Sequence, residues 1–328
     1  MTLVGRLDRF QQRHPQIGLP LAVVYKFFDD QGNYLAALIT YYGFLSLFPL
    51  LLLLSTVLNF ALHGDVALQQ RVLKSALGQF PMIGAQLKDT RGVSGSGIGL
   101  VIGVLGTLYG GLGAAQAAQN AMNTVWRVPR NSRPNPLRSR GRSLVLISVV
   151  GVSVAGTTVL SALSGSADAF GATVHAGLRI LLVIASLLAN IVVFTVAFRV
   201  ATTKDISIRQ TLPGASFAAL SWQVLQLFGT AYVGHVVKNA TVTNSVFALV
   251  LGLIGWIYLE AFVVVLAAEY NAVRALGLYP RSLLTPFTDD VVLTDADRAA
   301  YTSQARAQRS KGFEDISVSF NPPERTDD

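Results

Sequence analysis

The chain has 328 residues, of which 52% are hydrophobic and only 13% are charged, and its mean hydropathy is +0.48. Ordinary soluble domains carry about 25% charged residues, so this composition argues against the soluble class. The absence of cysteine excludes disulfide bonds, thiolate catalysis and cysteine-ligated metal. The formal net charge of +8 fits nucleic acid or anionic lipid as a partner, and the position of the positive charge decides between them.

Residues 1–33 form a mixed-charge leader, in which residues 21–28 are apolar enough to lie at a membrane interface as a short helix. The apolar run at about 34–62 starts too late and is too long for a cleaved signal peptide. We therefore expect it to stay in the membrane as the first span. Pro49 lies inside this span, on a face with small and polar residues that favours tight helix packing.

The connection between the first two spans, residues 63–96, contains an amphipathic segment. Leu68, Val72, Ala76 and Phe80 recur at helical spacing, with polar residues on the opposite face. This pattern predicts an extra amphipathic helix that lies on the membrane surface or caps the bundle. Binding of a partner protein is the alternative role for this helix.

The second span, at about 97–125, has glycines at four-residue spacing in its first half, which allows another backbone to approach closely. Four carboxamides follow on one face: Gln116, Gln119, Asn120 and Asn123. Such a face should not contact lipid, because an unpaired amide in hydrocarbon is costly. Hydrogen bonding between helices and a polar pathway through the bundle explain this face equally well.

Residues 127–142 hold six arginines, three prolines and no acidic residue. A nucleic-acid site would include aromatic stacking partners, and this segment has none. Between two apolar spans, the segment is typical of a cytoplasmic loop. We therefore expect no nucleic acid as a partner.

The third, fourth and fifth spans are predicted at about 143–163, 178–198 and 211–236. Gln223 and Gln226 lie within one polar face of the fifth span. With six spans and both termini inside, the 26 basic residues divide into 20 on the cytoplasmic side and six outside. This asymmetry predicts cytoplasmic N- and C-termini.

The sixth span, at about 246–272, contains Glu260 near its middle and Glu269 near its end. A carboxylate at mid-bilayer costs roughly 2.5–3.5 kcal/mol, so Glu260 should face protein or water. Nine positions at 100° per residue put the two glutamates on opposite faces of the helix. Trp256 and Asn271 share the face of Glu260.

Two interpretations of Glu260 follow. It lines one internal cavity with the carboxamides of the second and fifth spans and binds a cation, a proton or a polar headgroup. Alternatively, it is a buried, protonated glutamic acid that is hydrogen-bonded to a neighbouring amide. We interpret Glu269 as structural, paired near the cytoplasmic end with an arginine such as Arg199 or Arg127. We also assign structural roles, as polar or kink positions, to Asn271, Trp256 and Pro49.

Residues 273–328 form a mixed-charge tail. Thr294 and Asp297 have the spacing of a capping box before a short helix of about 295–310, and the last fifteen or so residues are expected to be disordered. The sequence thus predicts an all-α, polytopic membrane protein. Its parts are the leader, a six-span bundle over residues 34–272 and this cytoplasmic tail.

Several segments carry a resemblance to a known family. They are LAALITYYGFLSLFPLLLLLSTVL in the first span, NTVW at 123–126, LPGA at the start of the fifth span, and GWIYLEAFVVVLAAEYNA in the sixth. Over roughly residues 20–276 the chain resembles the YihY/BrkB family of bacterial inner-membrane proteins, once labelled ribonuclease BN. Ala267 stands where that family usually has glycine. The resemblance implies a six-span bundle in the bacterial cytoplasmic membrane and no settled activity, although proposals centre on envelope lipid or lipopolysaccharide transport.

No catalytic constellation accompanies these features. The four histidines are scattered without metal-ligand spacing, and no phosphate-binding loop or nucleophile elbow is present. We therefore expect no enzyme, no metal and no cofactor. The leading hypothesis is a transporter for a lipid-like or amphiphilic envelope substrate, with membrane lipids as partners. The alternative is a non-catalytic scaffold that recruits envelope proteins through residues 66–88 or the basic tail. Oligomeric state does not follow from the sequence.

Overall fold

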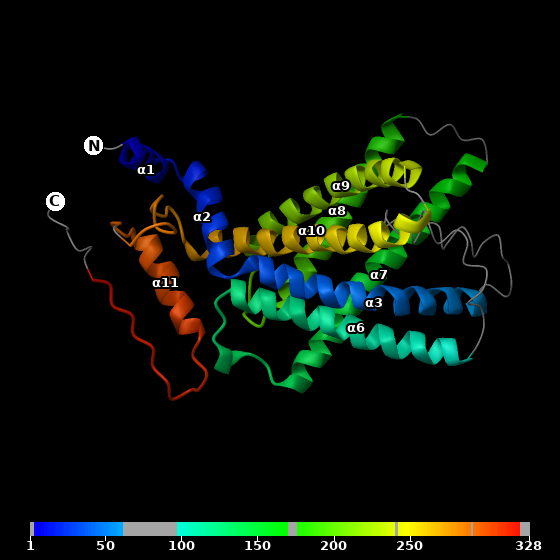
Figure 1. Cartoon of the computed structure of the whole chain (residues 1–328), viewed down its shortest axis with the longest axis horizontal. Coiled ribbons are helices and arrows are strands. Elements are labelled where there is room, and N and C mark those ends of the chain that lie inside the picture. The colour runs from blue at the N-terminus through cyan, green and yellow to red at the C-terminus, as the bar shows by residue number, and fades with distance from the viewer. Residues whose placement is uncertain (1–2, 62–96, 170–175, 240–241, 290, 322–328) are drawn as a thin grey trace.

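The computed structural model describes residues 3–61, 97–169, 176–239, 242–289 and 291–321, which contain helices and no strand (Figure 1). The six long helices are α3 (Gly32–Ala61), α6 (Gly97–Val125), α7 (Pro136–Ala169), α8 (Ala176–Ala201), α9 (Ile208–Asn239) and α10 (Val242–Leu276). They correspond one for one to the six apolar segments of the sequence, and most extend a few residues beyond them. The amphipathic helix predicted between the first two segments lies outside the described residues.

Shorter helices flank this bundle: α1 (Leu3–Arg13), α2 (Pro15–Asp29), α11 (Asp295–Ala307) and a single 3-10 turn, η2 (Arg130–Ser132). The apolar stretch of the leader falls within α2. Helix α11 starts with the predicted capping box, because the Thr294 hydroxyl accepts from the backbone N–H of Asp297 and the Asp297 side chain accepts from that of Thr294. Asn135 caps α7 in a similar way through the backbone N–H of Arg138.

All six long helices have one end in the same region, which we call the polar end. The helices alternate in direction, so that α3, α7 and α9 begin there and α6, α8 and α10 finish there (Figure 1). Polar contacts join these ends. The backbone N–H of Thr203 donates to Asn123 Oδ1 at 2.9 Å, and that of Gly214 donates to Asn271 Oδ1 at 2.7 Å. Helices α1, α2 and α11 lie at this end too (Figure 1).

Small residues let the long helices approach closely. Among the described residues, a large buried cluster includes side chains of all five helices from α6 to α10, seven of them alanines at positions 115, 201, 215, 218, 267, 268 and 272. A Cβ atom at Gly110 of α6 would lie only 2.7 Å from Ser46 Cα of α3, and one at Gly214 would overlap the carbonyl of Ala267. Close packing of this kind is typical of helices associated within a membrane.

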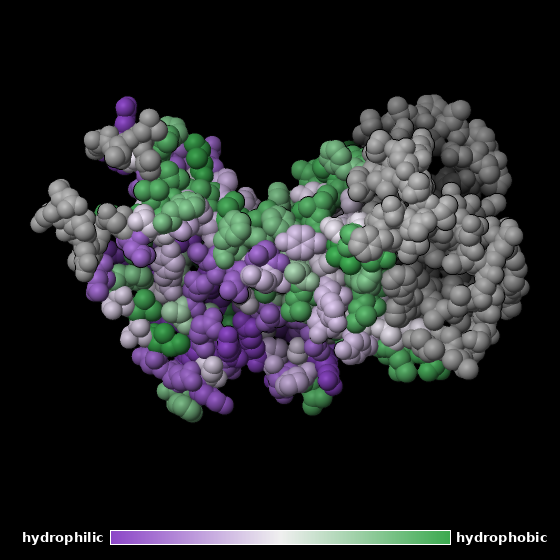
Figure 2. Space-filling view, in the orientation of Figure 1, coloured by the Kyte–Doolittle hydropathy of each residue, from purple (hydrophilic) through white to green (hydrophobic). Residues whose placement is uncertain are grey.

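Large apolar side chains are exposed along the bundle. Exposed examples are Leu105 and Tyr109 on α6, Leu188 on α8, and Leu227 and Phe228 on α9. Hydrophilic residues gather over the helix ends and loops nearer the chain termini, whereas hydrophobic residues cover much of the coloured bundle surface (Figure 2). Among the described residues, Val183–Ala201 and Val250–Leu276 are helical, long and apolar enough to cross a membrane. A surface of this kind suits contact with lipid and not with water.

The close approach of α3 and α6 predicts a position-specific response to added volume. Gly110→Ala should destabilise the protein by about 1–3 kcal/mol, because its Cβ meets the backbone of Ser46. Gly255→Ala, at a helical position where a Cβ meets nothing within 4 Å, should be neutral or stabilise by up to about 1 kcal/mol. Unfolding of the detergent-solubilised protein measures both, and equal stabilities of the two variants would contradict the close contact.

Candidate functional site

Four buried charges meet at the polar end, and we call them the buried quartet: Lys26, Asp30, Arg127 and Glu269. Lys26 Nζ donates to Glu269 Oε2 at 2.6 Å and to Asp30 Oδ2 at 2.7 Å, and also to the carbonyl of Val125 at 2.8 Å. Arg127 Nη1 lies 2.5 Å from Asp30 Oδ1. Two positive and two negative groups therefore compensate one another away from water.

The sequence-based prediction that Glu269 pairs with an arginine was wrong. Its ion-pair partner is Lys26 and not an arginine. Arg127 joins the group through Asp30, whereas Arg199 Nε donates to the carbonyl of Ile206. Lys26 of α2 and Asp30, the C-cap residue of that helix, are four residues apart. This spacing brings two side chains together, and it is the signal of the cluster in the sequence.

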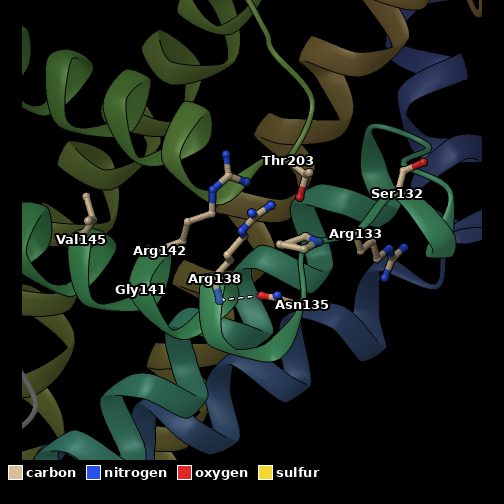
Figure 3. A pocket seen from close by; sticks show the side chains of 9 residues that line it. Ser132, Arg133, Asn135, Arg138, Gly141, Arg142, Val145 and Thr203 are labelled. Atoms are coloured by element: carbon tan, nitrogen blue, oxygen red, sulfur yellow. Dashed lines mark hydrogen bonds between the residues drawn. The ribbon is translucent and has the colours of Figure 1, made fainter.

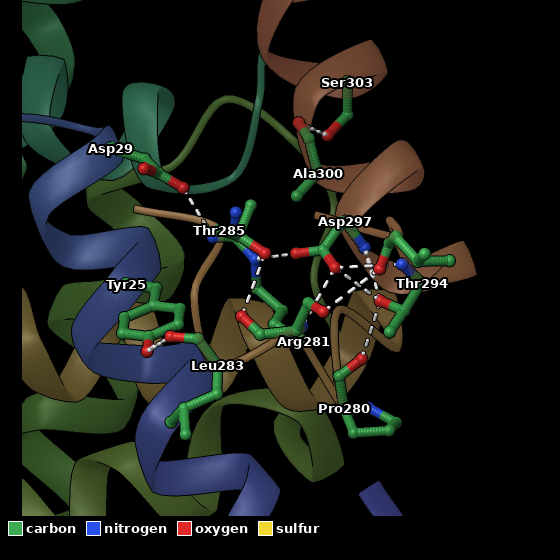
Figure 4. A network of polar contacts seen from close by, with 12 residues as sticks. Tyr25, Asp29, Pro280, Arg281, Leu283, Thr285, Thr294, Asp297, Ala300 and Ser303 are labelled. Carbon is green, nitrogen blue, oxygen red and sulfur yellow. Dashed lines mark hydrogen bonds and ion pairs between the residues drawn. The ribbon is translucent and has the colours of Figure 1, made fainter. Parts of the chain in front are cut away.

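A second buried cluster surrounds Arg281, in the connection between α10 and α11 (Figure 4). Its side chain is 1% exposed; its Nη1 lies 2.5 Å from Asp29 Oδ2 and its Nε 2.8 Å from Asp297 Oδ1. The rings of Tyr25 and Tyr301 flank the guanidinium. Although burial lowers the pKa of Arg281, Asp29 and Asp297 raise it above its ordinary value. The cluster ties α2 to α11.

The carboxamides of α6 bond to α7 and to connections at the polar end. Asn120 accepts from Arg133 Nη1 at 2.7 Å, and Gln119 Nε2 donates to Ser143 Oγ at 2.8 Å. The side chain of Asn123 accepts from the backbone of the α8–α9 connection, and Gln116 is exposed. Bonds between secondary-structure elements therefore account for three of these four side chains.

Glu260 has a different environment, further along α10. Its Oε1 accepts from Trp256 Nε1 at 2.7 Å, and the residue is half-buried. It does not share the partners of the α6 carboxamides. On α9, Gln223 Nε2 donates to Ser186 Oγ of α8 at 3.2 Å, and Gln226 is half-buried. Helix α3 continues through Pro49, whose side chain lies outside the described residues.

Asn271 has a clear structural role. Besides accepting from the backbone N–H of Gly214, it donates through Nδ2 to the carbonyl of Thr211 at 3.0 Å. Both groups lie in the first turns of α9, close to Pro213. Asn271 thus supplies hydrogen bonds where α9 begins and packs against α10.

Two cavities that share Arg142, Val145 and Thr203 lie beside the start of α7. Their volumes are about 660 and 560 Å³. Basic residues in their walls are Arg133, Arg138, Arg142, Arg199 and Lys204. Arg138 and Arg142 extend from α7 toward the connection that carries Thr203 (Figure 3). We call these joined cavities the basic groove.

The basic groove also has an apolar wall. Val145 of α7 and Val196 and Val200 of α8 lie beside the arginines. A molecule with an anionic head and an apolar body fits such a surface better than a purely ionic one. In the sequence, the signal for this site is the arginine-rich segment 127–142, whose arginines alone do not indicate the apolar neighbours. Among the described residues, no group of His, Asp and Glu could hold a metal ion.

Comparisons with known proteins identify the family of this chain. The pattern of the family described as "Virulence factor BrkB" matches residues 23–283. The chain belongs to the BrkB family. It is 26% identical over 255 residues to ribonuclease-like protein YfkH of Bacillus subtilis (strain 168), covering 74% of this chain and 90% of that one. It is 27% identical over 297 residues to a UPF0761 membrane protein of Azotobacter vinelandii (strain DJ), covering 86% and 69% of the two chains. No solved structure matches.

Family and fold together make this chain a membrane protein of the BrkB family, as the resemblance implied. The matched residues include α3 and α6 to α10 and end just after Arg281. Helices α1 and α11 lie outside the match, although α11 makes polar contacts with Arg281 and Asp29 inside it. The name of the Bacillus relative refers to ribonuclease.

The buried quartet predicts a large effect from removal of one charge. Lys26→Met should destabilise the protein by about 3–5 kcal/mol, because two buried carboxylates lose their shared cation. Adding Glu269→Gln should recover part of this loss by removing one stranded charge. Lys311→Met, at an exposed tail residue, is the matched control and should be neutral. Unfolding in detergent measures all three, and a double variant no more stable than Lys26→Met would contradict the coupling.

Proposed function

We propose that the protein is a transporter of the bacterial cytoplasmic membrane that moves or exposes an amphiphilic envelope substrate with an anionic head. The observation that carries this proposal is the basic groove, in which arginines adjoin the apolar side chains of α7 and α8. The head would bind Arg138 and Arg142, and the apolar body would lie along Val145 and Val196. Arginine suits such a head because its planar fork matches phosphate and carboxylate groups.

Six membrane spans are part of this proposal. All six long helices have one end at the polar end. If these helices cross the membrane, α1, α2 and α11 lie together on one side of it. The arginines of residues 127–142 lie at that end, and an excess of basic residues marks the cytoplasmic side. We therefore assign the polar end to the cytoplasm. The basic groove would then receive its substrate from the inner leaflet.

Glu260 is the second element of the proposed route. Its carboxyl bonds to Trp256 within the segment Val250–Leu276, which is apolar enough to span the membrane. A polar pair at such a depth is costly unless it has a role or a compensating partner. Glu260 would offer a polar group to the substrate head, a proton or a cation between the two leaflets. The carboxamides of α9 would assist it from the neighbouring helix.

A scaffold remains the second candidate, because the Arg281 cluster ties α2 to α11 and α1 bonds to the segment after α10, which together build a firm surface at the polar end. Such a surface would recruit envelope proteins without moving a substrate. Loss of function on changes confined to the surface of α1 or α11, with lipid movement absent from the purified protein, would favour the scaffold.

The assigned topology can be tested directly because the chain contains no cysteine. Single cysteines at Lys311 in the tail and at His175, in the predicted outer connection, report the two sides of the membrane. In intact cells, a membrane-impermeant maleimide should label the cysteine at position 175 and not the one at 311. Labelling of position 311 without permeabilisation would contradict cytoplasmic termini.

Transport itself is tested with purified protein in proteoliposomes that contain a fluorescent anionic phospholipid. Wild type should accelerate its movement between leaflets. Glu260→Gln should slow this movement about tenfold or more, if a charged or proton-binding group acts on the route. Arg138→Gln/Arg142→Gln should weaken the preference for anionic over zwitterionic lipid.

Glu314→Gln, the same chemical change in the tail, is the control and should behave as wild type. Movement that is equal in Glu260→Gln and wild type would remove Glu260 from the route while leaving transport in place. No movement in any sample of folded protein would contradict the transporter.

A further inference from the structure

A third cavity, separate from the basic groove, lies between the end of α6 and α11. Its volume is about 440 Å³. Three arginines and two hydroxyl residues line it, together with Pro129: Arg127, Arg298, Arg306, Thr302 and Ser303. The proposed function does not use this cavity, which we call the tail cavity.

Arg127 is the unusual member of the lining. Its side chain is only 6% exposed, and its Nη1 pairs with Asp30. Its Nε and Nη2 atoms are buried and have no hydrogen-bond partner among the described residues. Buried guanidinium N–H groups nearly always have an acceptor, and these two atoms lack one among the described residues.

The opposite wall comes from one face of α11. Arg298, Thr302 and Arg306 follow one another at four-residue spacing, which stacks them along the helix. Both arginines are exposed. Asp297 pairs with Arg281, and Asp30 pairs with Lys26 and with Arg127 itself, so Arg298 and Arg306 keep their charges uncompensated by these two carboxylates. The tail cavity therefore keeps an excess of positive charge.

The walls are held in place before any ligand arrives. Gln304 Nε2 donates to the carbonyl of Asp29 at 2.8 Å, and the backbone N–H of Asn131 donates to the carbonyl of Arg309 at 3.1 Å. Ala300 packs in a buried cluster with residues of α2 and α10. These contacts fix α11 against the turn that follows α6, so little order has to be gained on binding.

We propose that the tail cavity binds a phosphate group. Three guanidinium groups and the Thr302 hydroxyl supply N–H and O–H donors to several oxygens of one tetrahedral anion, and arginine binds such oxygens in pairs. The Ser303 hydroxyl already donates to the carbonyl of Ala300. Either a water-soluble phosphate compound or a lipid phosphate can supply this chemistry. Because Arg127 also holds Asp30, the bound phosphate would contact the buried quartet directly and stabilise the junction of α2, α6 and α10.

The test uses the full chain in detergent with inorganic phosphate as the probe. Binding is measured from the line width of the phosphorus-31 signal of phosphate, at constant ionic strength. The variant Arg298→Gln/Arg306→Gln removes the two exposed arginines and leaves Arg127 in the quartet. The control Arg209→Gln/Arg274→Gln removes two other exposed arginines of the polar end and has the same net charge. A second arm counts phosphatidylglycerol and phosphatidylcholine molecules retained by each protein in native mass spectrometry.

Wild type and control should bind phosphate equally, and the variant should bind about tenfold or more weakly. Variant-sensitive retention of phosphatidylglycerol, without binding of inorganic phosphate, would support the site and identify a lipid as its source. Binding of inorganic phosphate alone would support a soluble ligand. Equal behaviour of all three proteins in both arms, or no binding in either arm, would overturn the site. Lipid movement in proteoliposomes is a separate readout, so failure here leaves the proposed transport standing.

Discussion

The polar end of the molecule depends on compensation of charge in the buried quartet. An ion taken out of water costs several kcal/mol even after relaxation, so Lys26 is tolerated only where Asp30, Glu269 and a backbone carbonyl surround it. Those groups belong to α2, α6 and α10. The charges therefore fix the axial register of these helix ends, since a shift of one helix by a single turn would separate the charged groups. Apolar packing alone would not specify that register so strictly.

Arginines at the polar end have three different tasks, which a count of positive charge cannot separate. Arg281 is buried and structural, held by Asp29 and Asp297. Arg138 and Arg142 line the basic groove beside apolar side chains. Arg127 has both kinds of contact, because its guanidinium pairs with Asp30 and its side chain also lines the tail cavity. Burial and acidic neighbours distinguish these roles, and both depend on the fold.

The long helices were predictable because a membrane span requires only length and apolar composition, and those are local properties of the sequence. The capping box of α11 was predictable for the same reason, since its two partners are three residues apart. The partner of Glu269 was not, because Lys26 lies 243 positions away. Helical spacing correctly grouped Trp256 with Glu260. It could not assign partners to Gln119 or Asn123, which bond to residues whose positions follow from the packing of other helices.

The pairing of α2 with the segment after α10 also constrains the order of events during biosynthesis. Asp29 and Arg281 are 252 positions apart, and Gln304 reaches back 275 positions to the same residue of α2. The ribosome therefore delivers all six long helices before Arg281 and Gln304, the partners of Asp29, exist. Until then, Asp29 lacks both of these partners. A chain whose synthesis stops before Arg281 would leave the Asp29 carboxylate unpaired. We expect membrane proteases to degrade such incompletely folded chains.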